Sequence, residues 1–150
     1  MKRTQEGELV TSLILGTFRL NGELLAAGNS LTKPFGLTSA RWQVMGAIDL
    51  AKHPLTVAQI ARRMGLARQG VQRIVNDLEG LEMVCFEANP EDRRAQLVAM
   101  TEKGAMVMNE VNTAQAAWVN QLSDGLNLRH LKQAVAVLEN IRERTEKTNE

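Results

Sequence analysis

The segment LTVAQIARRMGLARQGVQRIVNDLEG, residues 55–80, gives the clearest indication of the fold. Its first half predicts a short helix that begins after an N-cap threonine, Thr56, and ends at Gly65, a residue suited to a left-handed C-cap. Its second half predicts a helix from about Ala67 to Gly80, whose buried face repeats at helical spacing through Val71, Ile74, Val75 and Leu78. Two such helices joined by a short glycine turn are typical of a helix-turn-helix.

The segments on either side extend this pattern. MVCF at 83–86 and LVAM at 97–100 predict two short strands, and NPEDRR at 89–94 predicts the charged tip of a hairpin between them. Upstream, Thr38 is a good N-cap for a helix that ends before His53 and Pro54. A helix, a helix-turn-helix and a hairpin in this order predict a winged helix-turn-helix.

Helices are also predicted outside this core. Apolar periodicity predicts one from about 8 to 28, a long one capped by Thr101, and a last one after a break at 123–127. We therefore expect a mainly α chain with a small two- or three-stranded β-wing, in a single domain spanning 1–150. Its DNA-binding lobe would be 37–100, and 1–30 and 101–150 would form a helical dimerisation region.

The composition is that of a globular chain. Among 150 residues, 44% are hydrophobic, aromatic residues make up 3%, and the net charge is +1, so total charge gives no sign of a polyanionic partner. The single cysteine, Cys85, fits a reducing compartment, and we expect a cytoplasmic protein. The basic, apolar start is interrupted by acidic residues, so we expect neither a signal peptide nor a membrane span.

The distribution of charge is more informative than its sum. No acidic residue lies between Asp49 and Asp77, whereas that stretch contains five basic ones. The second helix of a helix-turn-helix enters the major groove, where Arg suits guanine, and Gln or Asn suits adenine. The candidate readers on its polar face are Arg68, Gln69, Gln72, Arg73 and Asn76. The alternative is an ordinary solvated face. Arg62 and Arg63, on the preceding helix, would contact phosphates or remain surface charges.

The segments that form this pattern resemble the MarR family of bacterial regulators. The resemblance rests on LTSARWQVM at 37–45, on the helix-turn-helix at 55–78, and most specifically on NPEDRR at 89–94 followed by Val98, Thr101 and Gly104. It departs from the family at two places. Asn89 stands where an aspartate is frequent, and Ala67 with Gly70 replaces a serine cap followed by threonine. The recognition helix would then be frayed at its start, or Gly70 would allow a closer approach to DNA.

The resemblance implies roles for the wing and the flanks. Asp92 would hold one arginine of the tip while the other, of Arg93 and Arg94, enters the minor groove; we favour Arg94. The flanking helices would form a homodimer, in agreement with apolar stripes on 9–18 and 131–141 that one small core does not need; closure within a monomer is the alternative. A small aromatic or phenolic effector would bind an apolar crevice near Phe18, Trp42, Met45 and Trp118.

The sequence offers little for catalysis. His53, His130 and Cys85 lie far apart without metal-ligand spacing, and no nucleophile elbow, phosphate loop or dinucleotide motif occurs. We expect no enzyme, no metal and no cofactor. The favoured function is a sequence-specific, homodimeric repressor that binds a palindromic operator on double-stranded DNA. The alternative is a winged-helix protein-interaction module without sequence-specific DNA binding.

Overall fold

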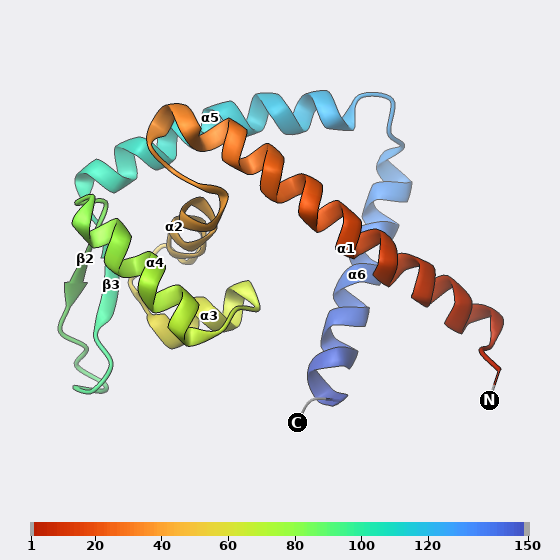
Figure 1. The fold of residues 1–150 in the computed structure, drawn as a ribbon, viewed down its shortest axis with the longest axis horizontal. Coiled ribbons are helices and arrows are strands. Elements are labelled where there is room, and N and C mark those ends of the chain that lie inside the picture. Colours follow the sequence, from red (N-terminus) through yellow and green to blue (C-terminus); the bar gives the residue numbers. More distant parts are fainter. Residues whose placement is uncertain (1, 149–150) are drawn as a thin grey trace. The chain divides into compact units, whose positions relative to one another are not determined.

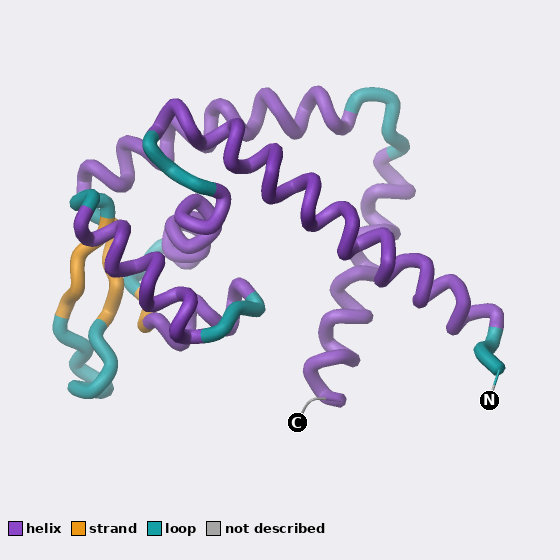
Figure 2. The backbone as a smooth tube through the Cα atoms, in the orientation of Figure 1, coloured by secondary structure: helices purple, strands orange, loops and turns teal. Residues whose placement is uncertain are grey.

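The computed structural model describes residues 2–148, whose fold is mainly helical with one small sheet (Figures 1 and 2). The element order is α1 (Gln5–Thr32), η1 (Lys33–Phe35), α2 (Ser39–Ala51), β1 (Leu55–Thr56), α3 (Val57–Met64), α4 (Arg68–Gly80), β2 (Val84–Glu87), β3 (Leu97–Met100), α5 (Glu102–Ser123) and α6 (Leu128–Thr148). The predicted fold class is confirmed. The chain divides into two compact units, one ending at Gln115 and the other beginning at Ala116.

The sheet has three antiparallel strands in the order β1-β3-β2. β3 pairs with β2 from Val84↔Met100 to Glu87↔Leu97, and its other edge pairs with β1 through Leu55↔Val98. The third strand, which the sequence left open, is therefore the short segment just before α3. It ties the start of the helix-turn-helix to the wing.

The core of the first unit lies between α2, α3, α4, the sheet and the start of α5. Its fully buried side chains include Met45 of α2, Ile60 of α3, Val71 and Val75 of α4, and Val98 of β3. Met45 and Ile48 lie one turn apart on α2, and both are buried there. This packing fixes the orientation of α4, because one face of that helix is apolar and the opposite face is polar.

The first helix is longer than predicted, because α1 continues through Gly28 to Thr32. Gly28 lies where α1 crosses α2: a Cβ at this position would come within 2.6 Å of the Ser39 hydroxyl oxygen. Thr32 is fully buried and donates a hydrogen bond to the Gly28 carbonyl, and the Asn29 side chain accepts one from the Ser39 N–H at 2.7 Å. The glycine therefore permits a close helix crossing and does not end the helix.

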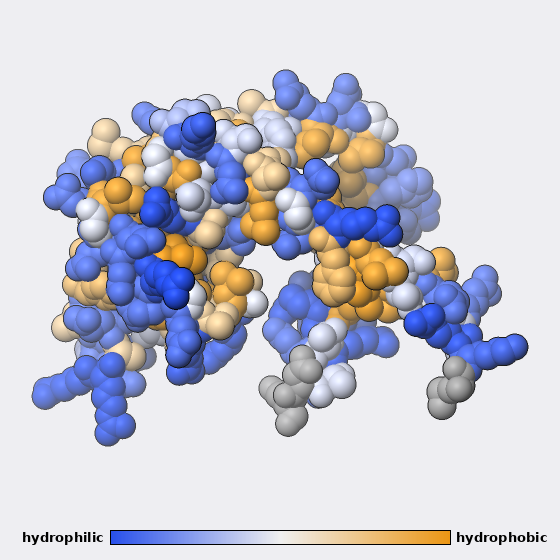
Figure 3. All heavy atoms as spheres, viewed as in Figure 1, coloured by the Kyte–Doolittle hydropathy of each residue, from blue (hydrophilic) through white to orange (hydrophobic). Residues whose placement is uncertain are grey.

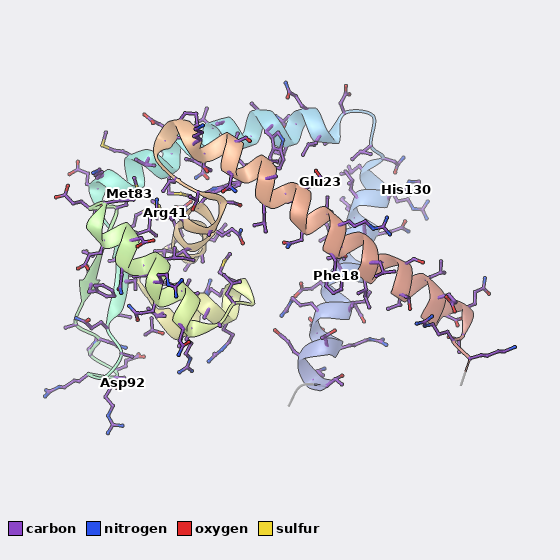
Figure 4. The ribbon with its side chains drawn as sticks, viewed as in Figure 1. Phe18, Glu23, Arg41, Met83, Asp92 and His130 are labelled. Atoms are coloured by element: carbon purple, nitrogen blue, oxygen red, sulfur yellow. The ribbon has the colours of Figure 1, made fainter. Side chains whose placement is uncertain are left out.

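Helix α1 is both long and apolar. The segment Gln5–Phe35 meets the length and composition of a membrane-crossing helix, with a mean hydropathy of 1.2 in its most apolar window. Soluble core helices and signal sequences meet the same criterion. Many of its large apolar side chains are exposed, including Phe18, which projects from the helix in Figure 4.

The second unit contains the end of α5 and all of α6. α5 ends at Ser123 and α6 begins at Leu128, with Gly125 in the left-handed region at φ 74°, so the predicted break is confirmed. On α6 the Arg142 guanidinium hydrogen-bonds Glu139 and holds the pKa of that carboxyl below its usual value. Val135 and Leu138, large apolar residues of the same helix, are exposed.

Candidate nucleic-acid interface

The helix-turn-helix begins with a well-capped α3. The Thr56 hydroxyl accepts from the Gln59 N–H at 3.2 Å, and the Gln59 side chain accepts from the Thr56 N–H at 2.8 Å, which forms a capping box. The helix ends at Gly65 with φ 64°, a left-handed conformation that glycine adopts without strain. Both ends predicted from the sequence are confirmed, and they set the angle at which the chain enters α4.

The recognition helix α4 exposes the five predicted readers. Val71, Val75 and Leu78 are buried, whereas the opposite side is exposed at Arg68, Gln69, Gln72, Arg73 and Asn76. Its N-cap, Ala67, makes no side-chain hydrogen bond, as its residue type predicts. The first turn therefore leaves backbone N–H groups without a side-chain cap, at a position where a phosphate oxygen could accept them.

The wing is a short hairpin with an ordered polar tip. Asn89 donates from its amide to the Ala95 carbonyl at 2.9 Å and accepts from the Glu91 N–H at 3.1 Å, so the turn chemistry survives without an aspartate. Asp92, labelled in Figure 4, accepts from the backbone N–H of Arg94 at 2.9 Å. Within the described part of the chain, Asp92 makes no ion pair with a tip arginine, so it supports the tip through the main chain.

Both tip arginines are exposed, and hydrophilic side chains extend from the wing in Figure 3. They differ in their neighbours. Arg94 lines a groove of about 580 Å³ between the wing and α4, whereas Arg93 does not line it. From α4 this groove is lined by Arg68, Gln69, Gln72 and Asn76, and from the wing by Phe86 of β2 and by Gln96, which precedes β3. Arg73 is exposed outside this groove.

The sequence missed Thr56, Phe86 and Gln96 as part of this groove. Thr56 was recognised only as a cap, and Phe86 only as a strand residue. Alternation along β2 could have indicated which side Phe86 faces, but its proximity to α4 depends on how the sheet packs. The groove combines cations with amide groups on a concave surface, which suits both phosphate and base contacts.

Two contacts hold α4 and the wing in place. Arg41 of α2, labelled in Figure 4, forms an ion pair of 3.4 Å with Asp77 near the end of α4. At the base of the wing, Thr101 accepts from the Gly104 N–H at 3.0 Å and donates to the Glu82 carbonyl at 2.7 Å. The second contact confirms Thr101 as the cap of α5 and joins this helix to the loop that follows α4.

A second pocket of about 470 Å³ lies between α2, α3 and α5. Trp42, Met64 and Met108 give it an apolar wall, and Arg63 with Asn112 adds polar groups. Of the four residues expected near an effector, Trp42 lines this pocket, whereas Met45 is fully buried in the core. Phe18 is 70% exposed on α1, and Trp118 belongs to the second unit.

The position of Arg63 is informative. Arg62 and Arg63 are both exposed on α3, yet only Arg63 lines the pocket. No sequence signal separates two adjacent arginines on one short helix. Their different surroundings follow from the packing of α3 against α2.

A capped helix-turn-helix, a polar recognition helix and an arginine-tipped hairpin around one groove define a winged helix-turn-helix DNA-binding protein. The MarR family profile matches residues 35–95. An uncharacterized protein of Mycobacterium tuberculosis is 34% identical over 118 residues, which cover 79% of this chain and 81% of that protein. This chain belongs to the MarR family of DNA-binding transcription regulators.

Solved structures agree with this assignment. A MarR/EmrR family transcriptional regulator from Acinetobacter sp. ADP1 matches with a TM-score of 0.83 at 19% identity, covering 93% of this chain and 98% of the other. CouR from Rhodococcus jostii RHA1, bound to p-coumaroyl-CoA, matches with a TM-score of 0.75 at 25% identity, covering 82% of this chain and 86% of the other. The M. tuberculosis regulator MOSR, in complex with DNA, matches at 0.72 and 20% identity, covering 88% and 96%.

Proposed function

We propose that this protein is a homodimeric, cytoplasmic repressor that binds a palindromic operator and is released by a small aromatic effector. The observation that carries the proposal is the groove between α4 and the wing, where Arg68, Gln72, Asn76 and Arg94 converge. The M. tuberculosis regulator with the same fold is described in complex with DNA. Selecting binding sites from a random duplex library, followed by salt titration of the selected duplex, tests the proposal directly.

In this proposal α4 reads base edges in the major groove, and Arg94 reaches the adjacent minor groove. Arg68 and Gln69 lie in the first turn of α4, the part of a recognition helix that contacts bases. Arg73, Arg93 and Arg62 are exposed outside the groove, and we assign them to backbone phosphates. Asp92 then acts indirectly, because it holds the main chain of the tip that carries Arg94.

Residues 1–30 and 101–150 would supply the dimer interface. On α1, Leu9, Leu15 and Phe18 are 66%, 50% and 70% exposed, and on α6 Val135 is 68% exposed. Several large apolar side chains exposed along one helix are a feature of surfaces that associate with a partner. A second copy of the chain would bury these faces and set the distance between the two recognition helices.

We expect Phe18→Asp and Val135→Asp each to convert the dimer to monomer at low micromolar concentration, because a two-fold interface would bury two unpaired carboxylates per substitution. Sedimentation equilibrium measures the mass of each variant. Leu50→Asp is the control: Leu50 is 81% exposed but lies on α2, outside the proposed interface. A monomeric wild type would contradict the assignment of α1 and α6 to a dimer interface. A wild type that stays in solution only with detergent would contradict it too.

The pocket beside Trp42 would bind the effector. Its volume of about 470 Å³ is at the small end of ligand pockets, which suits a single aromatic ring carrying a carboxylate or phenol. Arg63 supplies a cation at the pocket, and Asn112 donates to the Asp49 carboxylate at 3.3 Å, which holds α5 against α2. CouR, of similar fold, is described bound to a phenolic thioester. An effector between α2, α3 and α5 would shift the two α4 helices relative to each other.

We expect 4-hydroxybenzoate to change the fluorescence of Trp42 in a Trp118→Phe background, and Arg63→Ala to weaken this binding at least tenfold. Arg62→Ala is the matched control, because Arg62 is adjacent on α3 but does not line the pocket. Equal affinity of the two arginine variants would show that Arg63 plays no part in binding. No spectral change at millimolar ligand would remove this ligand class from the proposal.

A further inference from the structure

Two amide side chains on the exposed face of α4 are joined to each other. The Gln72 amide nitrogen, Nε2, donates to the Asn76 carbonyl oxygen, Oδ1, at 2.9 Å. The two residues lie four positions apart, so they are neighbours on one face of the helix. Both line the groove beneath the wing and both are exposed, which leaves their remaining polar atoms available to a ligand.

This hydrogen bond determines which atoms of Gln72 remain free. A carboxamide has two donor hydrogens on nitrogen and an acceptor oxygen, and rotation by 180° exchanges the two ends. The contact with Asn76 occupies one hydrogen and fixes the nitrogen on the Asn76 side. Oε1 and the second N–H of Gln72 stay unused, as does the Asn76 amide nitrogen among the described contacts.

These free atoms match one base. Adenine presents an N6–H donor and an N7 acceptor side by side in the major groove, so it pairs with one acceptor and one donor. Guanine presents two acceptors there, O6 and N7, and requires two donors. An oriented Gln72 offers an acceptor and a donor together, which fits adenine and not guanine.

We propose that Asn76 is a positioning residue that orients Gln72 to read an adenine in each half-site. The inference rests on the proposed reading of bases by α4. It specifies which base is read, and it assigns base contact to Gln72 and orientation to Asn76. A bidentate contact of this kind discriminates against the wrong base by roughly 5- to 150-fold, the equivalent of about 1–3 kcal/mol.

The test is selection of duplex sites from a random library by the full-length wild type and by variants, with base preference read at each position. Wild type should prefer adenine at one position of each half-site, and Gln72→Ala should lose that preference. Asn76→Ala should reduce it at least fivefold although Gln72 is still present. Asn76→Asp should retain the adenine preference, because the carboxylate accepts the same hydrogen bond from Gln72. Its overall affinity for DNA should be lower, because the new negative charge is repelled by the phosphates.

Controls separate orientation from folding and from direct reading. Glu79→Ala, exposed on α4 outside the groove, should leave the preference unchanged. The double variant Gln72→Ala with Asn76→Ala should discriminate no worse than Gln72→Ala, and each variant should unfold at the wild-type temperature.

Three results would overturn the inference. If Asn76→Ala keeps the adenine preference, Asn76 does not orient Gln72. If Asn76→Asp loses it as fully as Asn76→Ala, the Asn76 amide reads the base itself. Gln72→Ala should lose the base preference at one position; if the wild type selects guanine at that position, only the assignment to adenine is refuted. If the wild type enriches no site at all, the proposed function is refuted as well.

Discussion

Binding of the selected duplex should weaken about 10³- to 10⁵-fold between 50 and 200 mM salt, because a dimer that neutralises about 6–10 phosphates releases their counterions. The exposed cations of α3, α4 and the wing would supply these contacts. Fluorescence anisotropy at a series of salt concentrations gives the slope of log affinity against log salt. Half-sites should lie about 10–10.5 bp apart, centre to centre. A flat salt response would contradict DNA binding through this surface.

Arg94→Ala provides the matched measurement within the same titration. Removing one phosphate or minor-groove cation from each subunit should lower the magnitude of the slope by about 2 per dimer. It should weaken specific and unrelated duplexes together, since the wing cation carries little base information. Arg129→Ala, an exposed position on α6 far from the groove in sequence, should leave the slope unchanged. If both variants behave alike, the wing does not contact DNA.

The second large effect concerns stability. Gly104 lies in the first turn of α5, where a Cβ would come within 2.0 Å of the Met83 carbonyl oxygen. That oxygen also accepts a hydrogen bond from the Thr101 N–H at 3.1 Å. The backbone at Met83 is therefore tied to the start of α5 and cannot easily move away from an added Cβ. We expect Gly104→Ala to lower the free energy of unfolding by about 3 kcal/mol, at the upper end of overpacking costs, and the melting temperature by roughly 6–12 °C.

Thermal unfolding at a fixed protein concentration measures this change, since melting of a dimer depends on concentration. Gly70→Ala is the control: its Cβ would meet nothing within 4 Å. Alanine in place of glycine inside α4 should raise stability by up to about 1 kcal/mol through helix propensity. If Gly70→Ala is more stable but binds DNA less well, Gly70 serves close approach to DNA. Wild-type stability in Gly104→Ala would show that α5 can move away from the wing.

The helix-turn-helix, the wing and the polar face of α4 could all be predicted from the sequence. These features depend on interactions within a few residues: the capping box of Thr56, the left-handed Gly65 and the helical spacing of Val71 and Val75. Local hydrogen bonding and periodic burial can be inferred from a short window of sequence. For the same reason Asn89 could be assigned to the turn before its two hydrogen bonds were known.

Contacts between residues that are distant in the sequence could be learned only from the three-dimensional structure. β1 pairs with β3 across some forty positions of chain, Arg63 reaches the pocket that Arg62 does not, and Met45 belongs to the core although Trp42 lines that pocket. The Gly28 crossing likewise extends α1 where the sequence predicted an end. The pairing of β1 depends on a strand that lies far away in the sequence. The other outcomes depend on the angle at which one helix packs on another, and that angle is set by side-chain shapes from separate segments, which no local pattern encodes.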